Sequence, residues 1–113
     1  SDFFRDQVKR LLEDHSYQVI GAEDGALAWQ ALLEHSSDVH VVLTDLEMPN
    51  MDGFELTEKI KNDNRFGHLP VIALTSLAGE DEQEKGRQMG IDEYHIKLDK
   101  QKLLASLAQY ASK

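Results

Sequence analysis

Three side chains suited to phosphoryl chemistry follow apolar, strand-like runs of this sequence. Asp45, Thr75 and Lys97 each come directly after such a run. A carboxylate can act as the nucleophile that takes up a phosphoryl group, while an ammonium and a hydroxyl can hold phosphoryl oxygens by charge and hydrogen bonding. Each residue alone also has a structural explanation, as a turn cap, a strand former or a solvated charge. Only the set of three indicates chemistry.

The patterns that position these residues alternate between helix and strand along the whole chain. The expected elements are a helix bearing Phe4, Val8, Leu11 and Leu12 on one face, a strand over Tyr17–Ala22, a helix to about Glu34, a strand over Val39–Thr44, a helix from Gly53 to about Asn62, a strand over Val71–Leu74, a helix over Gly79–Met89, a strand over Tyr94–Ile96 and a helix capped by Asp99. Such alternation predicts an α/β protein whose parallel sheet has helices on both faces. Parallel sheets carry their chemistry at the carboxyl ends of the strands, which is where the three residues fall.

Composition limits the classes of function. The 113 residues suffice for one domain, and the absence of cysteine excludes disulfides and thiolate chemistry. A net charge of −9 argues against nucleic acid or an anionic membrane as a partner, because both attract positive charge. The sequence has neither a membrane-length apolar run nor a signal-peptide pattern, so we expect a cytoplasmic protein. The acidic balance suits a divalent cation.

The stretch Asp45–Gly53 contains the string D-x-x-M-P-x-M-D-G, which resembles the phosphoacceptor loop of bacterial response-regulator receiver domains. The stretches Ala73–Ser76 and Tyr94–Lys97 resemble the same family, and together the likeness covers the chain. It implies one receiver domain over residues 1–113 with a flavodoxin-like (CheY-like) doubly wound parallel sheet of strand order 2-1-3-4-5. The segments Asp2–Arg5 and Lys97–Leu104 look closest to receivers of chemotaxis-type hybrid histidine kinases.

The resemblance also implies a role for each site residue. Asp45 is the phosphorylation site, and Lys97 pairs with a phosphoryl oxygen. Thr75 is the switch hydroxyl, and Tyr94 is the aromatic residue that changes orientation with it. Mg²⁺ is held by the Asp45 carboxylate and by the backbone carbonyl of Glu47. The implied partner is the phosphohistidine of a sensor kinase or phosphotransfer domain, and the receiver catalyses its own phosphorylation and dephosphorylation.

This chain departs from the family at three places. The family carries an acidic, metal-binding pair at the end of a first strand, just before a segment like residues 1–5. We therefore expect an N-terminally truncated domain that lacks this strand and is not stable as a monomer. The strand is either trimmed, disordered at that end, or supplied from elsewhere, as in a strand-swapped homodimer. Leu98 follows Lys97 where the family has proline, and a cis bond without proline costs about 2.5–4 kcal/mol, so a trans bond is expected. The acidic side chain of Glu47 is either solvated or tunes the metal site.

Two other functions compete with the phosphoacceptor switch. One is a degenerate receiver-like interaction module that is never phosphorylated. The other is a phosphatase of the haloacid-dehalogenase type that uses Asp45 as its nucleophile. Other conspicuous residues have structural interpretations, namely solvation or packing for the five histidines, helix–sheet packing for Trp29, and a solvated helix start for the acidic run 80–84.

Overall fold

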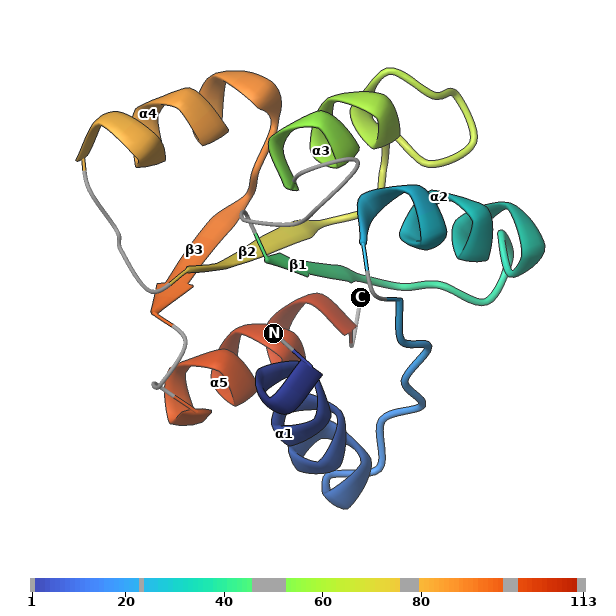
Figure 1. Ribbon diagram of the computed structural model, residues 1–113, viewed down its shortest axis with the longest axis vertical. Coiled ribbons are helices and arrows are strands. Elements are labelled where there is room, and N and C mark those ends of the chain that lie inside the picture. Colours follow the sequence, from blue (N-terminus) through green and yellow to red (C-terminus); the bar gives the residue numbers. More distant parts are fainter. Residues whose placement is uncertain (1, 23, 46–52, 76–79, 97–99, 112–113) are drawn as a thin grey trace.

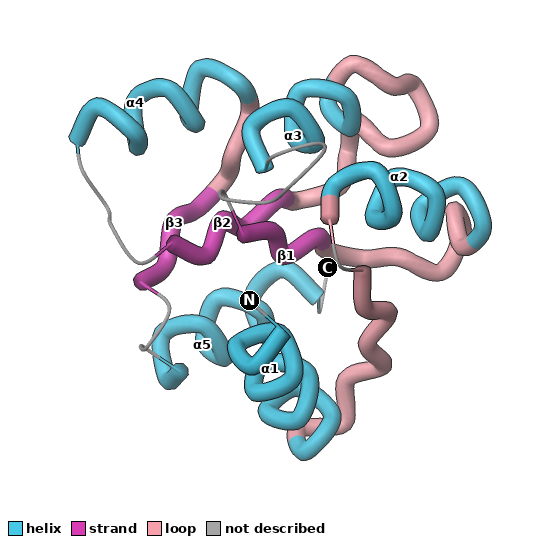
Figure 2. The backbone as a smooth tube through the Cα atoms, viewed as in Figure 1, coloured by secondary structure: helices cyan, strands magenta, loops and turns pink. Residues whose placement is uncertain are grey.

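The computed structural model describes residues 2–22, 24–45, 53–75, 80–96 and 100–111 of the chain. Its elements in chain order are α1 (Asp2–Asp14), α2 (Gly25–Glu34), β1 (Val42–Asp45), α3 (Gly53–Lys61), β2 (Val71–Thr75), α4 (Glu80–Met89), β3 (Glu93–Ile96) and α5 (Lys100–Ala111). The three strands form a parallel sheet in the order β1-β2-β3, as Figures 1 and 2 show. The predicted α/β alternation is therefore confirmed, with one exception described below.

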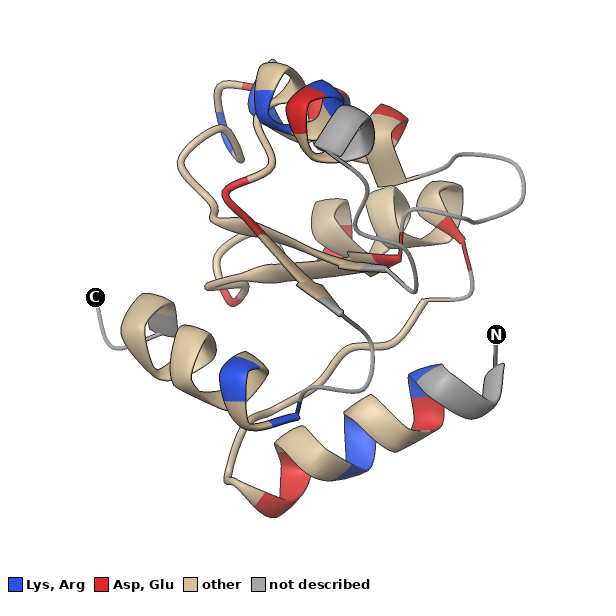
Figure 3. Ribbon diagram, turned by 90° about the vertical axis from the view of Figure 1, so that its left-hand side faces the viewer, with Lys and Arg blue, Asp and Glu red and all other residues tan. Residues whose placement is uncertain are grey.

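Helices cover both faces of the sheet. Figure 1 shows α2, α3 and α4 on one side and α1 and α5 on the other. Along β2 the side chains alternate accordingly: Val71 and Ala73 belong to the core on the α2–α3 side, whereas Ile72 and Leu74 belong to the core on the α1–α5 side. All four are buried, which is why this strand reads as a continuous apolar run. Charged residues lie mainly on helices and loops, as Figure 3 shows.

The strand predicted over Tyr17–Ala22 is wrong, because these residues belong to no strand in the structure. Burial still alternates along the segment, with Tyr17 and Val19 half-buried and Gln18 and Ile20 exposed. A strand requires a hydrogen-bonded neighbour, however, and a groove of about 1150 Å³ lies between this segment and β1. The segment thus has a strand-like pattern of side chains without a ladder of backbone hydrogen bonds.

Two helix ends are fixed by their own residues. Asp24 caps α2, since its Oδ1 accepts a hydrogen bond of 2.9 Å from the backbone N–H of Leu27. Gly90 ends α4 with a φ of 104°, a left-handed conformation that favours glycine. The backbone N–H of Ile91 then donates to the Gly86 carbonyl over 2.8 Å, which closes the last turn.

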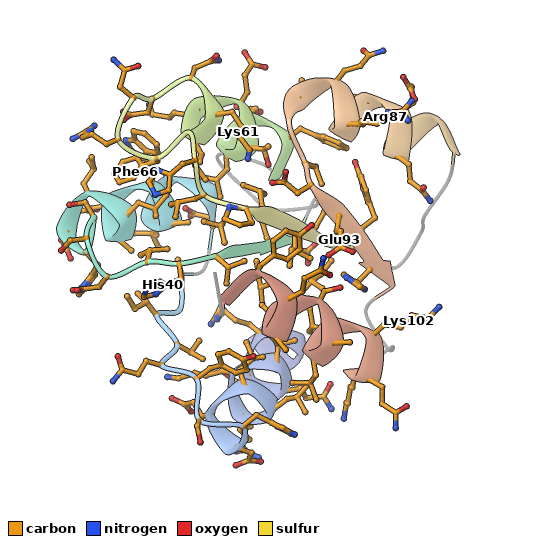
Figure 4. The ribbon with its side chains drawn as sticks, turned by 180° about the vertical axis from the view of Figure 1, so that it is seen from behind. His40, Lys61, Phe66, Arg87, Glu93 and Lys102 are labelled. Atoms are coloured by element: carbon orange, nitrogen blue, oxygen red, sulfur yellow. The ribbon has the colours of Figure 1, made fainter. Side chains whose placement is uncertain are left out.

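A polar network joins the amino ends of β2 and β3 to the end of α3. Asp92 Oδ2 accepts hydrogen bonds from the backbone N–H of Val71 at 2.7 Å and from Lys61 Nζ at 3.0 Å. The same Lys61 Nζ donates to the Leu69 carbonyl over 2.8 Å, and Figure 4 shows Lys61 at α3. A Cβ atom on Gly90 would lie 2.7 Å from Lys61 Cγ, so this glycine also gives the lysine stem its space.

Trp29 has the packing role expected of it. Its ring meets the buried Phe66 edge to face, with 5.4 Å between centroids and an interplanar angle of 85°. Figure 4 shows Phe66 in the layer of α2 and α3. Both residues belong to the core that includes Val71 and Ala73 of the sheet, so the contact joins helix to sheet. None of the helices in the described part of the chain is both long and apolar enough to cross a membrane.

Candidate functional site

Asp45 and Thr75 end neighbouring strands at the same edge of the sheet. Asp45 is the last residue of β1 and pairs in register with Leu74, the residue before Thr75. Thr75 is the last residue of β2 and pairs with Ile96, the last residue of β3. The parallel register therefore brings the carboxyl ends of the three strands together, as the sequence predicts for two of its three candidate residues.

The remaining predicted site residues lie partly or wholly outside the residues that the structure describes. Lys97 comes directly after β3 in the sequence, but Lys97, Leu98 and Glu47 all lie outside the described residues. The backbone of Thr75 is described as part of β2, whereas its side chain is not. The Asp99 cap and the peptide bond between Lys97 and Leu98 likewise lie outside. Their expected roles stay predictions.

Asp45 is half-buried at the end of β1. Its backbone carbonyl accepts a hydrogen bond of 2.9 Å from the hydroxyl of the buried Thr44, which holds the strand end in place. Asp45 also lines the groove between β1 and the segment 17–22. Asp45 is thus partly exposed beside this groove while its backbone is anchored.

The groove beside β1 exposes one edge of the sheet. The backbone N–H of Val42 donates to the Pro70 carbonyl at 2.9 Å, and Val42 pairs with β2. Backbone groups of successive residues in a parallel strand point to opposite sides, so those of Leu43 point away from β2 toward the groove. Leu43 itself lines the groove together with Val19, Val41 and Leu74. The groove therefore has apolar residues next to an edge strand, among a lining that also includes polar and charged residues.

Magnesium chemistry needs several oxygen ligands. Within the described ranges, no group of three or more acidic or histidine side chains could hold a metal ion. Asp45 supplies one carboxylate at the carboxyl edge of the sheet. This carboxylate fits a magnesium ligand but does not by itself form a site. Glu47, the other predicted contributor, is outside the description.

Tyr94 lies on the side of β3 that faces α4. It is half-buried and packs against the core on the α2–α3 side of the sheet. A Cβ atom built on Gly86 of α4 would overlap the Tyr94 hydroxyl oxygen, so the tyrosine reaches the backbone of this helix. Sequence reasoning missed Gly86; the available signal was a glycine in the interior of a predicted helix, where it is unfavourable.

The opposite side of β3 carries a polar cluster that contacts α5. His95 Nε2 lies 2.9 Å from Ser106 Oγ and 3.8 Å from Glu93 Oε2, and Figure 4 labels Glu93 close to α5. Burial raises the pKa of the Tyr110 hydroxyl, and so do the negative charges of Glu93 and Asp92 and a hydrogen bond with Glu93. His95 therefore has the structural role expected of it, as part of the contact between β3 and α5.

Comparison with known proteins agrees with this geometry. The family model described as the response regulator receiver domain matches residues 1–108, and the chain belongs to this family of two-component signalling domains. It is 35% identical over 98 residues to the chemotaxis protein CheY1 of Helicobacter pylori, an alignment that covers 86% of this chain and 78% of that protein. The predicted family and its likeness to chemotaxis receivers are confirmed.

Solved structures confirm the flavodoxin-like, CheY-like fold class. The receiver domain of a signal transduction histidine kinase from Syntrophus aciditrophicus is 25% identical, with a TM-score of 0.88 over 99% of this chain and 84% of that chain. The receiver domain of sensor histidine kinase PA1611 from Pseudomonas aeruginosa is 23% identical, with a TM-score of 0.84 over 100% of this chain and 92% of that chain. That structure has a magnesium ion coordinated in its active-site cleft.

Proposed function

We propose that this chain is a phosphoacceptor switch in which Asp45 receives a phosphoryl group from a phosphohistidine of a sensor kinase or phosphotransfer domain. The observation that supports the proposal is the parallel register that ends β1 at Asp45 beside the end of β2 at Thr75. A carboxylate oxygen of Asp45 forms the new bond to phosphorus, and the bond from phosphorus to the histidine nitrogen breaks. The product is an acyl phosphate on Asp45.

The other site residues hold the phosphoryl group. Thr75 offers a hydroxyl at the end of the neighbouring strand, and Lys97 offers an ammonium directly after β3. When bound beside Asp45 and the Glu47 carbonyl, Mg²⁺ would reduce the repulsion between the carboxylate and the incoming anion. Movement of Thr75 toward the phosphoryl group and reorientation of Tyr94 then change the surface of the domain. Such a domain acts in the cytoplasm, where its kinase partner presents the phosphohistidine.

Phosphorylation of the variant Asp45→Asn tests the assignment. We expect the unsubstituted protein to take up label from a small acyl-phosphate donor in the presence of Mg²⁺, because a carboxylate oxygen is available as the nucleophile. The label should be released by hydroxylamine, which cleaves acyl phosphates. Asp45→Asn should take up none, whereas the control Asp38→Asn, at an exposed aspartate, should label normally. Label retained by Asp45→Asn would refute the assignment.

A receiver-like interaction module that is never phosphorylated is the second candidate. Beryllofluoride with Mg²⁺, which imitates a phosphoryl group on a carboxylate, separates the two. A phosphoacceptor switch should show shifted Tyr94 resonances on addition of both, and an interaction module should show no response. The match to the receiver family gives no support to the phosphatase alternative.

We also infer that a further extended segment pairs with β1 in the working domain, so that residues 1–113 represent the domain without one strand. The outward-pointing backbone groups of Leu43 and the groove of about 1150 Å³ beside them support this inference. An exposed strand edge of this kind is a template for another strand. A second copy of the chain that places one of its own extended segments against this edge is the source we propose, as in a strand-swapped dimer.

A further inference from the structure

Gly86 lies in the interior of α4, where glycine is the least favourable residue other than proline. A glycine in place of an alanine in a helix interior destabilises the helix by roughly 0.8–1 kcal/mol. Gly90 is the glycine with positive φ in the described part of the chain, so backbone conformation does not require glycine at position 86. Gly86 is nevertheless buried. The reason for a glycine at this position must come from what packs against it.

The space that a side chain on Gly86 would take is filled by two residues. A Cβ atom there would overlap the Tyr94 hydroxyl oxygen and would lie 2.6 Å from Tyr94 Cζ and 2.8 Å from Ile91 Cδ1. These separations are well inside ordinary carbon contacts of about 3.5–4.0 Å. The Tyr94 ring can therefore occupy its observed position only while residue 86 has no side chain. We call this contact the Gly86–Tyr94 contact.

Space for a second orientation of Tyr94 exists next to this contact. A surface hollow of about 400 Å³ lies between α4 and β3, and Tyr94 itself lines it with Glu84, Arg87 and Ile91. Tyr94 is half-buried, so its hydroxyl end can leave α4 while its Cβ stays anchored on β3. The tyrosine thus has one orientation that depends on Gly86 and room for another that does not.

We propose that Gly86 is a positioning residue for the switch, because it holds Tyr94 against α4 in the unphosphorylated domain. The proposal rests on the proposed function in taking Tyr94 as the switch residue. A contact that is present in only one of two states shifts the equilibrium between them by the free energy that the contact contributes. Removing the Gly86–Tyr94 contact should therefore favour the second orientation and make the phosphorylated state easier to reach.

The substitution Gly86→Ala tests where the tyrosine ring lies. In NMR spectra of the unphosphorylated protein, the unsubstituted chain should give cross-peaks between the Tyr94 ring and the Ile91 methyl groups. Gly86→Ala should lose them, because the new methyl group occupies the position of the hydroxyl. Gly21→Ala is the matched control, since a Cβ there meets nothing within 4 Å. Persistence of the cross-peaks in Gly86→Ala would overturn the proposal.

Binding of beryllofluoride with Mg²⁺ gives a readout that a merely structural role would not move. We expect Gly86→Ala to reach half-saturation at a beryllofluoride concentration roughly threefold to tenfold lower than the unsubstituted protein does. This change corresponds to the free energy of one aromatic contact. Unchanged or weaker binding would contradict the positioning role. Label retained by Asp45→Asn would contradict the proposed function. The position of the Tyr94 ring in the unphosphorylated protein tests the Gly86–Tyr94 contact independently of that result.

A double-mutant cycle keeps the test decisive if Gly86→Ala is poorly folded. The cycle carries Ile91→Val in every variant, which removes the Cδ1 atom that would also meet the new methyl group. In the background Tyr94→Ala the ring is absent, so Gly86→Ala should then raise the folding equilibrium constant about fivefold through helix propensity alone. In the background that keeps Tyr94 the same change should lower it. The same sign in both backgrounds would show that Tyr94 is not what requires glycine at position 86.

Discussion

At the scale of single residues, the site depends on side chains whose neighbours fix their position or charge. Thr44 anchors the backbone of Asp45, and Gly86 leaves the space that Tyr94 occupies. A comparable case outside the site is Asp63, in the turn after α3. Its carboxylate accepts hydrogen bonds from Arg65 Nε at 3.0 Å, from Arg65 Nη2 at 2.9 Å and from the Arg65 backbone N–H at 2.8 Å.

The Asp63 carboxyl should titrate at unusually low pH. The hydrogen bonds from Arg65, side chain first and then backbone, lower its pKa from 3.8 to about 2. A depressed pKa in the folded state means that this group stabilises the fold above pH 3.8 and that the contribution is lost as the pH falls through about 2. An NMR titration of the carboxyl carbon measures this pKa directly.

The variant Arg65→Ala identifies the cause of the low Asp63 pKa. Without the guanidinium, the pKa of Asp63 should rise back toward 3.8, while the control Arg87→Ala should leave it at about 2. Arg87 contacts Glu84 on α4 and so provides a matched loss of positive charge elsewhere. An unchanged Asp63 pKa in Arg65→Ala would show that the ion pair is not the cause.

At the scale of secondary structure, Asp92 joins three elements near the amino ends of β2 and β3. It accepts a backbone hydrogen bond from the buried Val71 and pairs with Lys61 at the end of α3. Its own backbone N–H donates to the Val71 carbonyl over 2.8 Å. This network sets the start of the β2–β3 pairing, and thereby the register that brings Thr75 and Ile96 together at the other end.

Asp92→Ala should destabilise the fold by roughly 1–3 kcal/mol, because the buried Val71 N–H loses its side-chain acceptor. Urea unfolding at one fixed protein concentration measures the difference in free energy of unfolding. The control Glu58→Ala, at an exposed position on α3, should change stability by no more than about 0.5 kcal/mol. Equal unfolding midpoints for the two variants would mean that the network does not stabilise the strands.

At the scale of the whole molecule, the groove beside β1 leaves one edge of the sheet uncovered. Both faces of the sheet are covered by helices, yet the edge that carries Leu43 faces a groove of about 1150 Å³ with both polar and apolar residues in its lining. A chain that leaves such an edge unpaired in one copy can satisfy it by accepting a strand from another. We therefore expect the oligomeric state to depend on whether this edge of the sheet is paired.

Residues 1–113 alone should not behave as a stable two-state monomer. We expect size-exclusion chromatography with light scattering to show a dimer or larger species, and urea melts whose midpoint depends on protein concentration, because pairing at the groove is intermolecular. The variant Ile20→Lys, which places a charge at an exposed position of the groove lining, should weaken the dimer. A monomeric chain with one concentration-independent transition would contradict the inference.

The sequence alone determined what depends on local chemistry. The alternation of helix and strand, the Asp24 cap, the Gly90 helix end and the placement of Asp45 and Thr75 at strand ends all follow from periodicity and from short-range backbone requirements. The string that begins at Asp45 was sufficient to predict the receiver family. These features need no knowledge of which segments meet in space.

Only the tertiary structure decided what depends on neighbours distant in the chain. Tyr17–Ala22 has the side-chain pattern of a strand, but a strand also needs a hydrogen-bonded partner, which no local pattern reports. The contact of Tyr94 with Gly86 and the pairing of Asp92 with Val71 likewise arise when separate elements pack together. Side-chain type and spacing therefore predicted the chemistry, whereas packing decided how Tyr94 is held and where the sheet is open.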